Sequence, residues 1–175
     1  MKQSEIERLL PGIFQRTNAE GTPLRALLLA MEFLHEPDEA ILEHEEDYFS
    51  PLRAPASFVS FLAWWTDLDR FLTDVTDPLT GKEYRSLPSG VGQLRELILA
   101  STDLARWRGT RYGLNRLVEL ATGMTGFQWI DQIQERPFHL RAIAPAAAKR
   151  YETLINVIVR LEKPAYMTFD GVEFA

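Results

Sequence analysis

Two aspartates separated by one residue, Asp67 and Asp69, form the pair of side chains best suited to acid–base chemistry. Paired carboxylates can act as general acid and general base, and together with His44 they would make the catalytic set of a hydrolase. The sequence around the two aspartates supplies no histidine, lysine or glycine-rich loop to complete such a site. A hydrolase is therefore the remoter interpretation, and we expect a protein without enzymatic activity.

The acidic run from Glu43 to Asp47 is the other group of side chains that could bind a ligand. Its carboxylates and the imidazole of His44 are suitable metal ligands, but successive residues of a helix point in different directions and do not converge on one ion. His35 and His139 lie far away in the sequence, and His139, in a predicted strand, is expected to be structural. With no phosphate-binding glycine loop or nucleophile motif either, we expect a solvated acidic face, no metal and no cofactor.

Four arginines, Arg106, Arg108, Arg111 and Arg116, fall within about three helical turns. Such a cluster can bind phosphates, but the chain has a net charge of -6, and a nucleic-acid-binding protein needs a net basic face. The favoured interpretation is that these arginines pair with carboxylates of this chain or of a partner protein. We therefore expect no nucleic acid among the partners.

The chain has 175 residues, of which 46% are hydrophobic and 25% charged, and it has no cysteine. This length favours one compact domain, or one domain with a small appendage. The lack of cysteine leaves no disulfide and no thiolate ligand, which agrees with synthesis in a reducing cytosol. The most apolar segment, residues 24–34, is interrupted by Arg25 and Glu32 and is too short to cross a bilayer, so we expect neither a signal peptide nor membrane insertion.

The first part of the chain is predicted to be helical. Ser4 and Glu7 have capping-box spacing, and the pair Thr22-Pro23 offers an N-cap followed by proline at the first helical position. The helix that opens there is expected to run to about Tyr48, with a kink or a split at Pro37. Its apolar residues cover so much of its circumference that part of it should pack against another chain.

The segment that follows ends in two adjacent tryptophans. An apolar stretch begins at Phe58 and closes with Trp64 and Trp65. Both indoles cannot face one core, so one of them should lie at an interface. Residues 76–92, rich in proline, glycine, aspartate and serine, are expected to be a loop.

Two further helices are predicted around a tight glycine-threonine junction. The first should cover residues 93–106, with Leu94, Leu97, Ile98 and Leu104 inward. Thr110 then follows Gly109 as the N-cap of the second helix, and Gly123 suits the left-handed position that ends it.

Beyond residue 123 the apolar spacing changes from helical to strand-like. The predicted elements are strands at residues 127–133 and 138–143, a helix opened by Pro145, and a closing strand at residues 165–169. This order indicates a small α+β module. The predicted fold class is α+β, mainly α, with a helical domain at residues 1–123 and the small module at residues 124–175.

Five segments, in order along nearly the whole chain, resemble motifs of the tail protein I family of contractile phages and contractile injection systems. They are Leu10-Pro11-Gly12-Ile13-Phe14-Gln15, Tyr48-Phe49-Ser50-Pro51, Phe61-Leu62-Ala63-Trp64-Trp65, residues 106–114 and Lys163-Pro164-Ala165-Tyr166. The third is similar to an apolar helix of the family, and residues 106–114, with their Arg-Gly-Thr core, are the most specific of the five.

The resemblance implies a structural subunit of the baseplate wedge. Members of this family join larger wedge proteins around the tail hub and pass a conformational signal to the contractile sheath. For this chain the resemblance implies synthesis in the bacterial cytoplasm and incorporation into a phage tail or injection particle. The implied partners are larger wedge proteins, together with hub or sheath-proximal subunits, in a hetero-oligomer of six-fold symmetry.

The surplus apolar faces and the resemblance together predict a partner interface. Its predicted residues are Leu24, Leu27, Leu28, Met31, Leu34, Trp64, Trp65, Trp107, Arg108, Gly109, Thr110 and Arg111. Within it, Gly109 is expected to allow close approach of helices, and Arg108 to bond carboxylates or carbonyls of a partner. The main alternative is a helical adaptor or regulatory module that binds a single soluble protein through the same helices.

Overall fold

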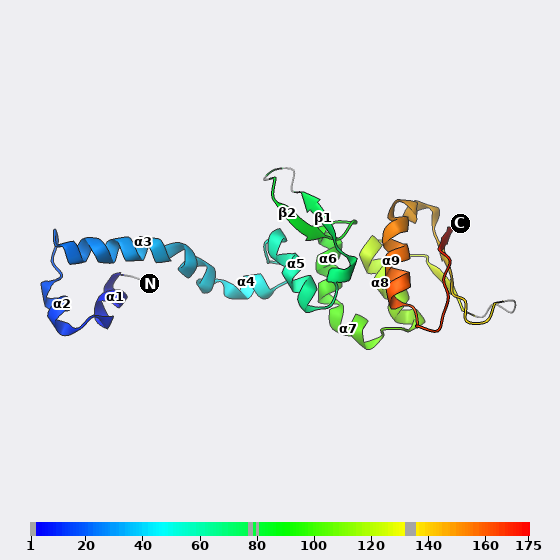
Figure 1. The fold of residues 1–175 in the computed structure, drawn as a ribbon, viewed down its shortest axis with the longest axis horizontal. Helices are drawn as coiled ribbons and strands as arrows, with labels where there is room; N and C mark the ends of the chain where they lie inside the picture. Colours follow the sequence, from blue (N-terminus) through cyan, green and yellow to red (C-terminus); the bar gives the residue numbers. More distant parts are fainter. Residues whose placement is uncertain (1–2, 77–78, 80, 132–135) are drawn as a thin grey trace. The chain divides into compact units, whose positions relative to one another are not determined.

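The computed structural model describes residues 3–76, 79, 81–131 and 136–175. Over these residues the protein is mainly helical, with two small sheets, which confirms the predicted α+β, mainly α class (Figure 1). The chain divides into two compact units, residues 1–48 and residues 49–175. No helix in the described part of the chain is both long enough and apolar enough to cross a membrane.

The N-terminal unit consists of short helices and one long one. They are α1 (Gln3–Leu9), α2 (Gly12–Thr17), α3 (Pro23–Glu43) and the start of α4 (Glu45–Phe49). The Thr22 side chain caps α3 by accepting a hydrogen bond from the Arg25 backbone N–H at 3.4 Å, and Pro23 takes the first helical position, as predicted. The helix continues through Pro37 to Glu43, so the proline does not split it.

The C-terminal unit carries the remaining helices and both sheets. Its elements are α5 (Ala56–Trp65), the 3-10 turn η1 (Asp69–Phe71), β1 (Thr73–Thr76), β2 (Glu83–Ser86), α6 (Val91–Leu99), α7 (Ser101–Arg106), α8 (Arg111–Thr122), β3 (Gln128–Ile130), β4 (Arg141–Ala144), η2 (Ala146–Tyr151), α9 (Glu152–Glu162) and β5 (Val172–Phe174). Helix α8 begins at the Thr110 cap and ends at Gly123 in the left-handed conformation, both as predicted.

The predicted loop over residues 76–92 is wrong at its centre. Strands β1 and β2 pair in antiparallel fashion there, with Val75 opposite Tyr84. Turn-forming residues on both sides of β2 dominate the composition and conceal a strand of four residues. The predicted helix over residues 93–106 is also interrupted at Ala100, because Ser101 and Asp103 favour helix starts over helix interiors.

The second sheet has the order β3-β4-β5. Strand β4 pairs antiparallel with β3, where Ala142 faces Trp129, and parallel with β5, where Ala142 faces Val172. The parallel pair is connected through η2 and α9, so the predicted order of strand, strand, helix and strand is present. The closing strand lies at residues 172–174 and not at 165–169, because a turn in which the Met167 N–H donates to the Pro164 carbonyl occupies that segment.

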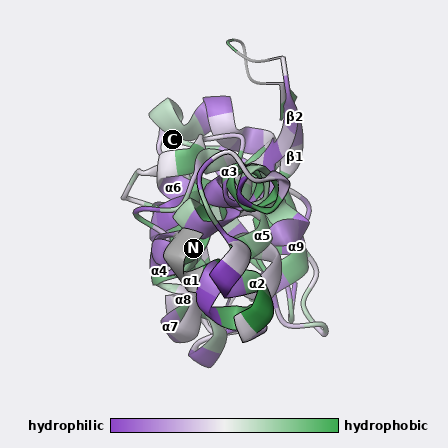
Figure 2. Cartoon of the chain, turned by 90° about the vertical axis from the view of Figure 1, so that its left-hand side faces the viewer, coloured by the Kyte–Doolittle hydropathy of each residue, from purple (hydrophilic) through white to green (hydrophobic). Residues whose placement is uncertain are grey.

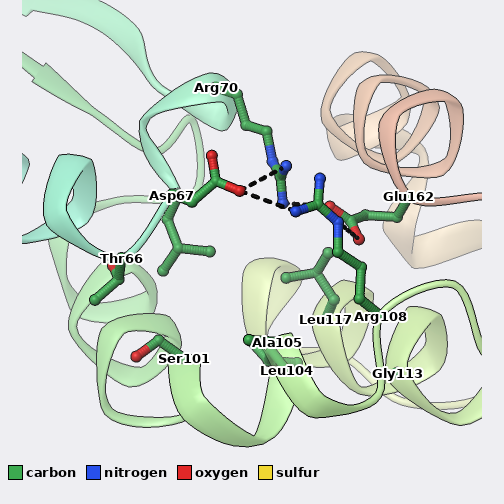
Figure 3. Close-up of a pocket in the computed structure, with 11 residues that line it drawn as sticks. Thr66, Asp67, Arg70, Ser101, Leu104, Ala105, Arg108, Gly113, Leu117 and Glu162 are labelled. Carbon is green, nitrogen blue, oxygen red and sulfur yellow. Dashed lines mark hydrogen bonds and ion pairs between the residues drawn. The ribbon is translucent and has the colours of Figure 1, made fainter.

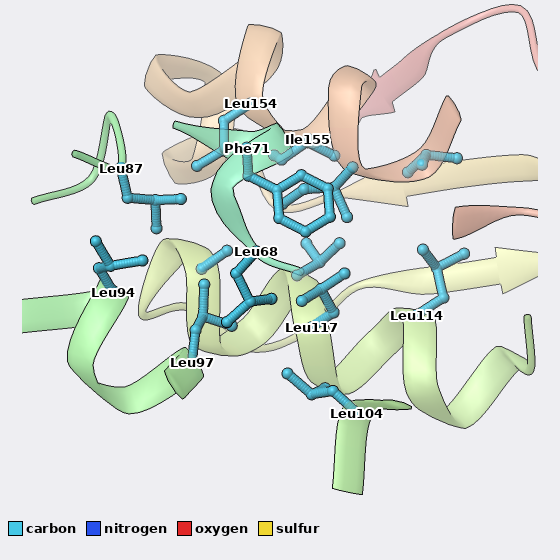
Figure 4. Packing of buried hydrophobic residues seen from close by; sticks show 14 of the residues in the cluster. Leu68, Phe71, Leu87, Leu94, Leu97, Leu104, Leu114, Leu117, Leu154 and Ile155 are labelled. Atoms are coloured by element: carbon cyan, nitrogen blue, oxygen red, sulfur yellow. The ribbon is translucent and has the colours of Figure 1, made fainter. Parts of the chain in front are cut away.

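One apolar core holds the C-terminal unit together. It includes Leu68 from the turn after α5, Leu97 from α6, Leu117 from α8 and Ile155 from α9 (Figure 4). The core extends without a break from Ala54 to Met167 and so crosses residue 123, where the sequence predicted a domain boundary. The division into compact units lies instead between residues 48 and 49.

Candidate protein-interaction surfaces

The first candidate surface lies on α3. Leu27, Leu34 and Ile41 follow one another at intervals of seven residues, and 57%, 71% and 47% of these side chains are exposed. Positions seven residues apart lie on almost the same side of a helix, so the three form one apolar stripe, the pattern that brings helices together in coiled coils. We call these three residues, together with the exposed Leu42, the α3 apolar surface.

The other predicted interface residues of α3 differ in their burial. Leu28 is buried, with only 2% of its surface exposed, and it forms the apolar interior of the N-terminal unit together with Ile6 of α1. The prediction that Leu28 faces a partner is therefore wrong, because α1 folds back against this side of α3. Leu24 is half-buried, and Met31 is exposed beside the surface that α1 covers.

A groove runs between α1 and α3. Its volume is about 310 Å³, and it is lined by Ile6, Leu9, Met31, His35, Asp38, Glu39 and Leu42. The lining is mainly apolar, with the carboxylates and the imidazole contributed by α3. This side of α3 is therefore only partly filled by α1 and leaves room for the side chains of another molecule.

The second candidate surface is an aromatic cluster on α5. Trp64 and Trp65 are 60% and 61% exposed, so both indoles lie outside the core, where the sequence predicted one of them. The centre of the Phe61 ring lies 5.8 Å from that of Trp64 and 5.4 Å from that of Trp65. Phe49 stacks on Trp65 with the ring centres 5.7 Å apart. Phe58 continues the chain of rings, 5.0 Å from Phe61. We call these five residues the α5 aromatic cluster.

The sequence analysis did not include three members of this cluster, Phe49, Phe58 and Phe61, among the predicted interface residues. Phe58, Phe61 and Trp65 are spaced three and four residues apart, so they share one side of α5. That spacing is the signal in the sequence that could have indicated a shared aromatic face. Large rigid aromatic side chains held in an exposed cluster are typical of the energetic centre of protein interfaces.

The Arg-Gly-Thr junction forms a tight bend between α7 and α8. The Thr110 hydroxyl accepts a hydrogen bond from the Gly113 N–H at 3.1 Å and donates one to the Trp107 carbonyl at 2.6 Å. Gly109 adopts a positive φ of 73°, a conformation that glycine reaches at little cost. The Trp107 ring meets Tyr112 edge-on at 5.5 Å, and both rings are partly exposed.

The close approach at this junction is made by Gly113. A Cβ atom added at Gly113 would lie 2.1 Å from the Trp107 carbonyl oxygen, whereas one added at Gly109 would meet no atom of the chain within 4 Å. Within the chain, the role predicted for Gly109 therefore belongs to Gly113, and Gly109 serves the left-handed turn. Thr110 and Arg111 are exposed next to it, beside a small pocket of about 110 Å³.

Arg108 has its partners inside its own chain. It bonds Asp67 at 3.0 Å and reaches the carboxylate of Glu162 at 3.4 Å, while Arg70 also pairs with both acids (Figure 3). This corrects the prediction that Arg108 bonds a partner protein. The four side chains come from the turn after α5, the end of α7 and the end of α9, so they tie three segments together beside a cavity of about 60 Å³.

The two aspartates considered for a hydrolase lie beside arginines. Asp67 is engaged by two guanidinium groups, and Asp69 lies 3.8 Å from Arg85. Both guanidinium groups pair with the same oxygen of Asp67, Oδ2, and so compete for it with any proton that a catalytic base would accept there. His44 is an exposed residue of the other compact unit. His139 is buried, with its Nδ1 2.8 Å from the Thr168 hydroxyl, as a structural histidine would be.

No protein-family model matches the chain, and no curated protein matches it. Among the residues that the structure describes, no group of three histidine or acidic side chains is placed to hold a metal ion. The exposed surfaces of α3 and α5 therefore carry the functional argument.

Proposed function

We propose that this chain is a structural subunit of a baseplate wedge in a contractile phage tail or injection system. In this role it binds larger wedge proteins, and neighbouring hub or sheath-proximal subunits, and helps couple rearrangement of the baseplate to sheath contraction. Its chemistry is protein association, without catalysis. The observation that carries the proposal is the exposure of the α3 apolar surface.

The exposure of that surface is unusual for a protein that acts alone. Its leucines and isoleucine are about half to three-quarters exposed, and Phe33 on another side of the same helix is 74% exposed. Burying one such side chain fully is worth roughly 1.5–3 kcal/mol. Large apolar side chains exposed at regular intervals along one helix are typical of an association site in a folded protein.

The α5 aromatic cluster supports the same function from the other compact unit. Phe61, Trp64 and Trp65 are exposed on a helix whose other side, including Val59 and Ala63, is fully buried in the core. A rigid scaffold of this kind presents aromatic side chains with little loss of conformational freedom on binding. Two association surfaces on two separate units favour a subunit with several neighbours over an adaptor with one soluble partner.

The test is assembly with the neighbouring subunit. We would co-express the full chain with the larger wedge protein encoded beside it and isolate the complex through a tag on that protein. The variant L34S/I41S removes two members of the α3 apolar surface. The control variant L161S replaces a leucine of α9 that is as exposed as Ile41.

The expected result is that wild type and L161S co-purify with the wedge protein and that L34S/I41S is lost. Cryo-electron microscopy of assembled particles should then show the chain in the baseplate. A wild-type chain that remains a well-behaved monomer and ignores every neighbouring tail protein would contradict the proposal. A complex with a single soluble protein unrelated to a tail would support the adaptor alternative instead.

A further inference from the structure

Charge is distributed very unequally between the two compact units. Residues 1–48 contain four lysines and arginines and eleven acidic residues, a net charge of -7. Residues 49–175 contain fifteen and fourteen, a net charge of +1. The acidity of the whole chain therefore resides in the unit that carries the α3 apolar surface.

Within the N-terminal unit the negative charge is concentrated in one segment. Residues 32–47 contain eight acidic residues and neither lysine nor arginine. Glu43, Glu45 and Glu46 are exposed there, around the C-terminal end of α3. The carbonyl end of a helix carries partial negative charge, so Glu43 in the last turn of α3 is unfavourable unless positive charge is supplied from elsewhere. Glu45 and Glu46 lie in the first turn of α4, where the helix dipole favours them, and they add to the negative charge beside Glu43.

The same segment contains exposed apolar residues. Ile41 and Leu42 are 47% and 65% exposed, and Leu42 also lines the groove between α1 and α3 with Asp38 and Glu39 at its edge. Viewed nearly along its axis, α3 carries both hydrophobic and hydrophilic residues (Figure 2). A binding partner must therefore provide apolar side chains and positive charge together.

The combination of exposed apolar residues and negative charge limits which molecule can bind at α3. A second copy of the chain would bring another strongly acidic segment against the first, and like charges in close contact are unfavourable. Nucleic acid and anionic lipid surfaces are excluded for the same reason. An amphipathic helix with lysine or arginine beside its apolar face satisfies both requirements.

We propose that α3 and the groove beside it form the docking site for a basic amphipathic helix, with the positive residues of that helix lying against residues 32–47. The inference rests on the proposed function, because the helix would belong to a neighbouring wedge subunit. It adds the chemical character of the partner helix. It also adds that the positive residues of the partner bind near the C-terminal end of α3. It also implies that binding weakens as salt is added.

The probe is a fluorescein-labelled synthetic peptide of about 18 residues, long enough to form helix, with leucine at heptad positions and lysine elsewhere. Two peptides of the same length serve as comparisons. In one, glutamate replaces every lysine; in the other, serine replaces every leucine. Fluorescence anisotropy with the full-length chain measures the affinity of each.

The leucine–lysine peptide should bind saturably, and its dissociation constant should rise about tenfold between low and high salt. The leucine–glutamate and serine–lysine peptides should bind at least tenfold more weakly, since each lacks one of the two requirements. Equal binding of the leucine–glutamate peptide would overturn the role of charge. Equal binding of the serine–lysine peptide would overturn the role of the apolar surface.

Variants of the chain locate the site. L34S/I41S and E43K/E46K should each weaken binding of the leucine–lysine peptide by about tenfold. The controls L161S and E83K/E96K make the same types of change at exposed positions of the C-terminal unit and should leave affinity unchanged. Circular dichroism of every variant checks that helix content is retained. If the controls weaken binding as much as the α3 variants do, the site is not on α3 and the inference fails.

The outcome is separable from that of the proposed function. If the wedge protein co-purifies with the chain but the leucine–lysine peptide does not bind, only the inference about the partner's chemistry is wrong. If the peptide binds at α3 but no tail protein associates with the chain, the docking site stands and the proposed function fails.

Discussion

The two compact units of this chain differ in how much of their apolar surface they bury within themselves. In residues 49–175, helices and strands cover one another around a continuous core from Ala54 to Met167. In the described part of residues 1–48, Ile6 and Leu28 are the only buried hydrophobic residues, although α3 is longer than any helix of the other unit. The N-terminal unit therefore forms a long helix but buries few of the apolar side chains of that helix.

The difference has a thermodynamic meaning. Burial of apolar surface is the main term that offsets the entropy lost on folding, and the N-terminal unit gains little of it alone. Its stability should consequently depend on binding, because a partner that binds only the folded form shifts the equilibrium towards it. The C-terminal unit needs no such help.

The largest expected effect contrasts leucines of the two units. Leu97 is fully buried in α6, and replacing it with alanine should destabilise the C-terminal unit by about 2–5 kcal/mol. The same change at the exposed Leu34 should alter stability by less than about 0.5 kcal/mol. Urea unfolding followed by tryptophan fluorescence and by circular dichroism measures both. A large loss at Leu34 in the isolated chain would break the comparison.

The next effect concerns the ion pairs that join three segments of the C-terminal unit. Arg70, 23% exposed in its side chain, pairs with the buried Glu162, whereas the side chain of Arg108 is 49% exposed. Arg70→Ala should cost about 1.5–3 kcal/mol, because a charged acceptor loses a partner out of contact with water. Arg108→Ala should cost about 0–1 kcal/mol. Urea unfolding of both variants tests this order, and a larger loss at Arg108 would reverse it.

A third pair of variants tests how tightly the bend between α7 and α8 is packed. Gly113→Ala would place a Cβ against the Trp107 carbonyl and should cost about 1–3 kcal/mol. Gly92→Ala, in α6, meets no atom within 4 Å and should stabilise by about 0.5–1 kcal/mol through helix propensity. Thermal unfolding of the two variants should therefore shift in opposite directions. Equal shifts would mean that the bend has room to adjust.

The smallest effect is a change in protonation. Arg141 bonds Glu173 across β4 and β5 at 2.9 Å, and this hydrogen bond lowers the pKa of Glu173 from its ordinary value. A lowered pKa stabilises the fold above the ordinary glutamate pKa, and this contribution is lost as pH falls through the lowered value. Arg141→Ala should raise the pKa of Glu173, measured by NMR titration of its carboxyl group. An unchanged pKa would show that the pair does not persist in solution.

Local features of the fold could be predicted well from the sequence. The caps at Thr22 and Thr110 and the left-handed end at Gly123 depend on side chains and backbone preferences within a few residues. The hairpin of β1 and β2 and the break at Ala100 were missed because the competing signals, turn residues and apolar spacing, pointed elsewhere. Local chemistry thus determines how helices begin and end more clearly than where a short strand lies.

Long-range features of the candidate surfaces were less accessible. Nothing near Arg70 in the sequence indicates that Glu162, 92 positions away, is its partner. The burial of Leu28 depends on which of several apolar sides of α3 packs against α1. The exposed residues of α3, in contrast, follow directly from a helix with more apolar circumference than one neighbour can cover.

The close contact at Gly113 makes the bend between α7 and α8 stiff. With the Trp107 carbonyl resting directly on the first turn of α8, there is no slack in which the bend could close further. A force on the exposed indole of Trp107 would therefore be transmitted through the backbone to the leucines of α8 that pack in the core.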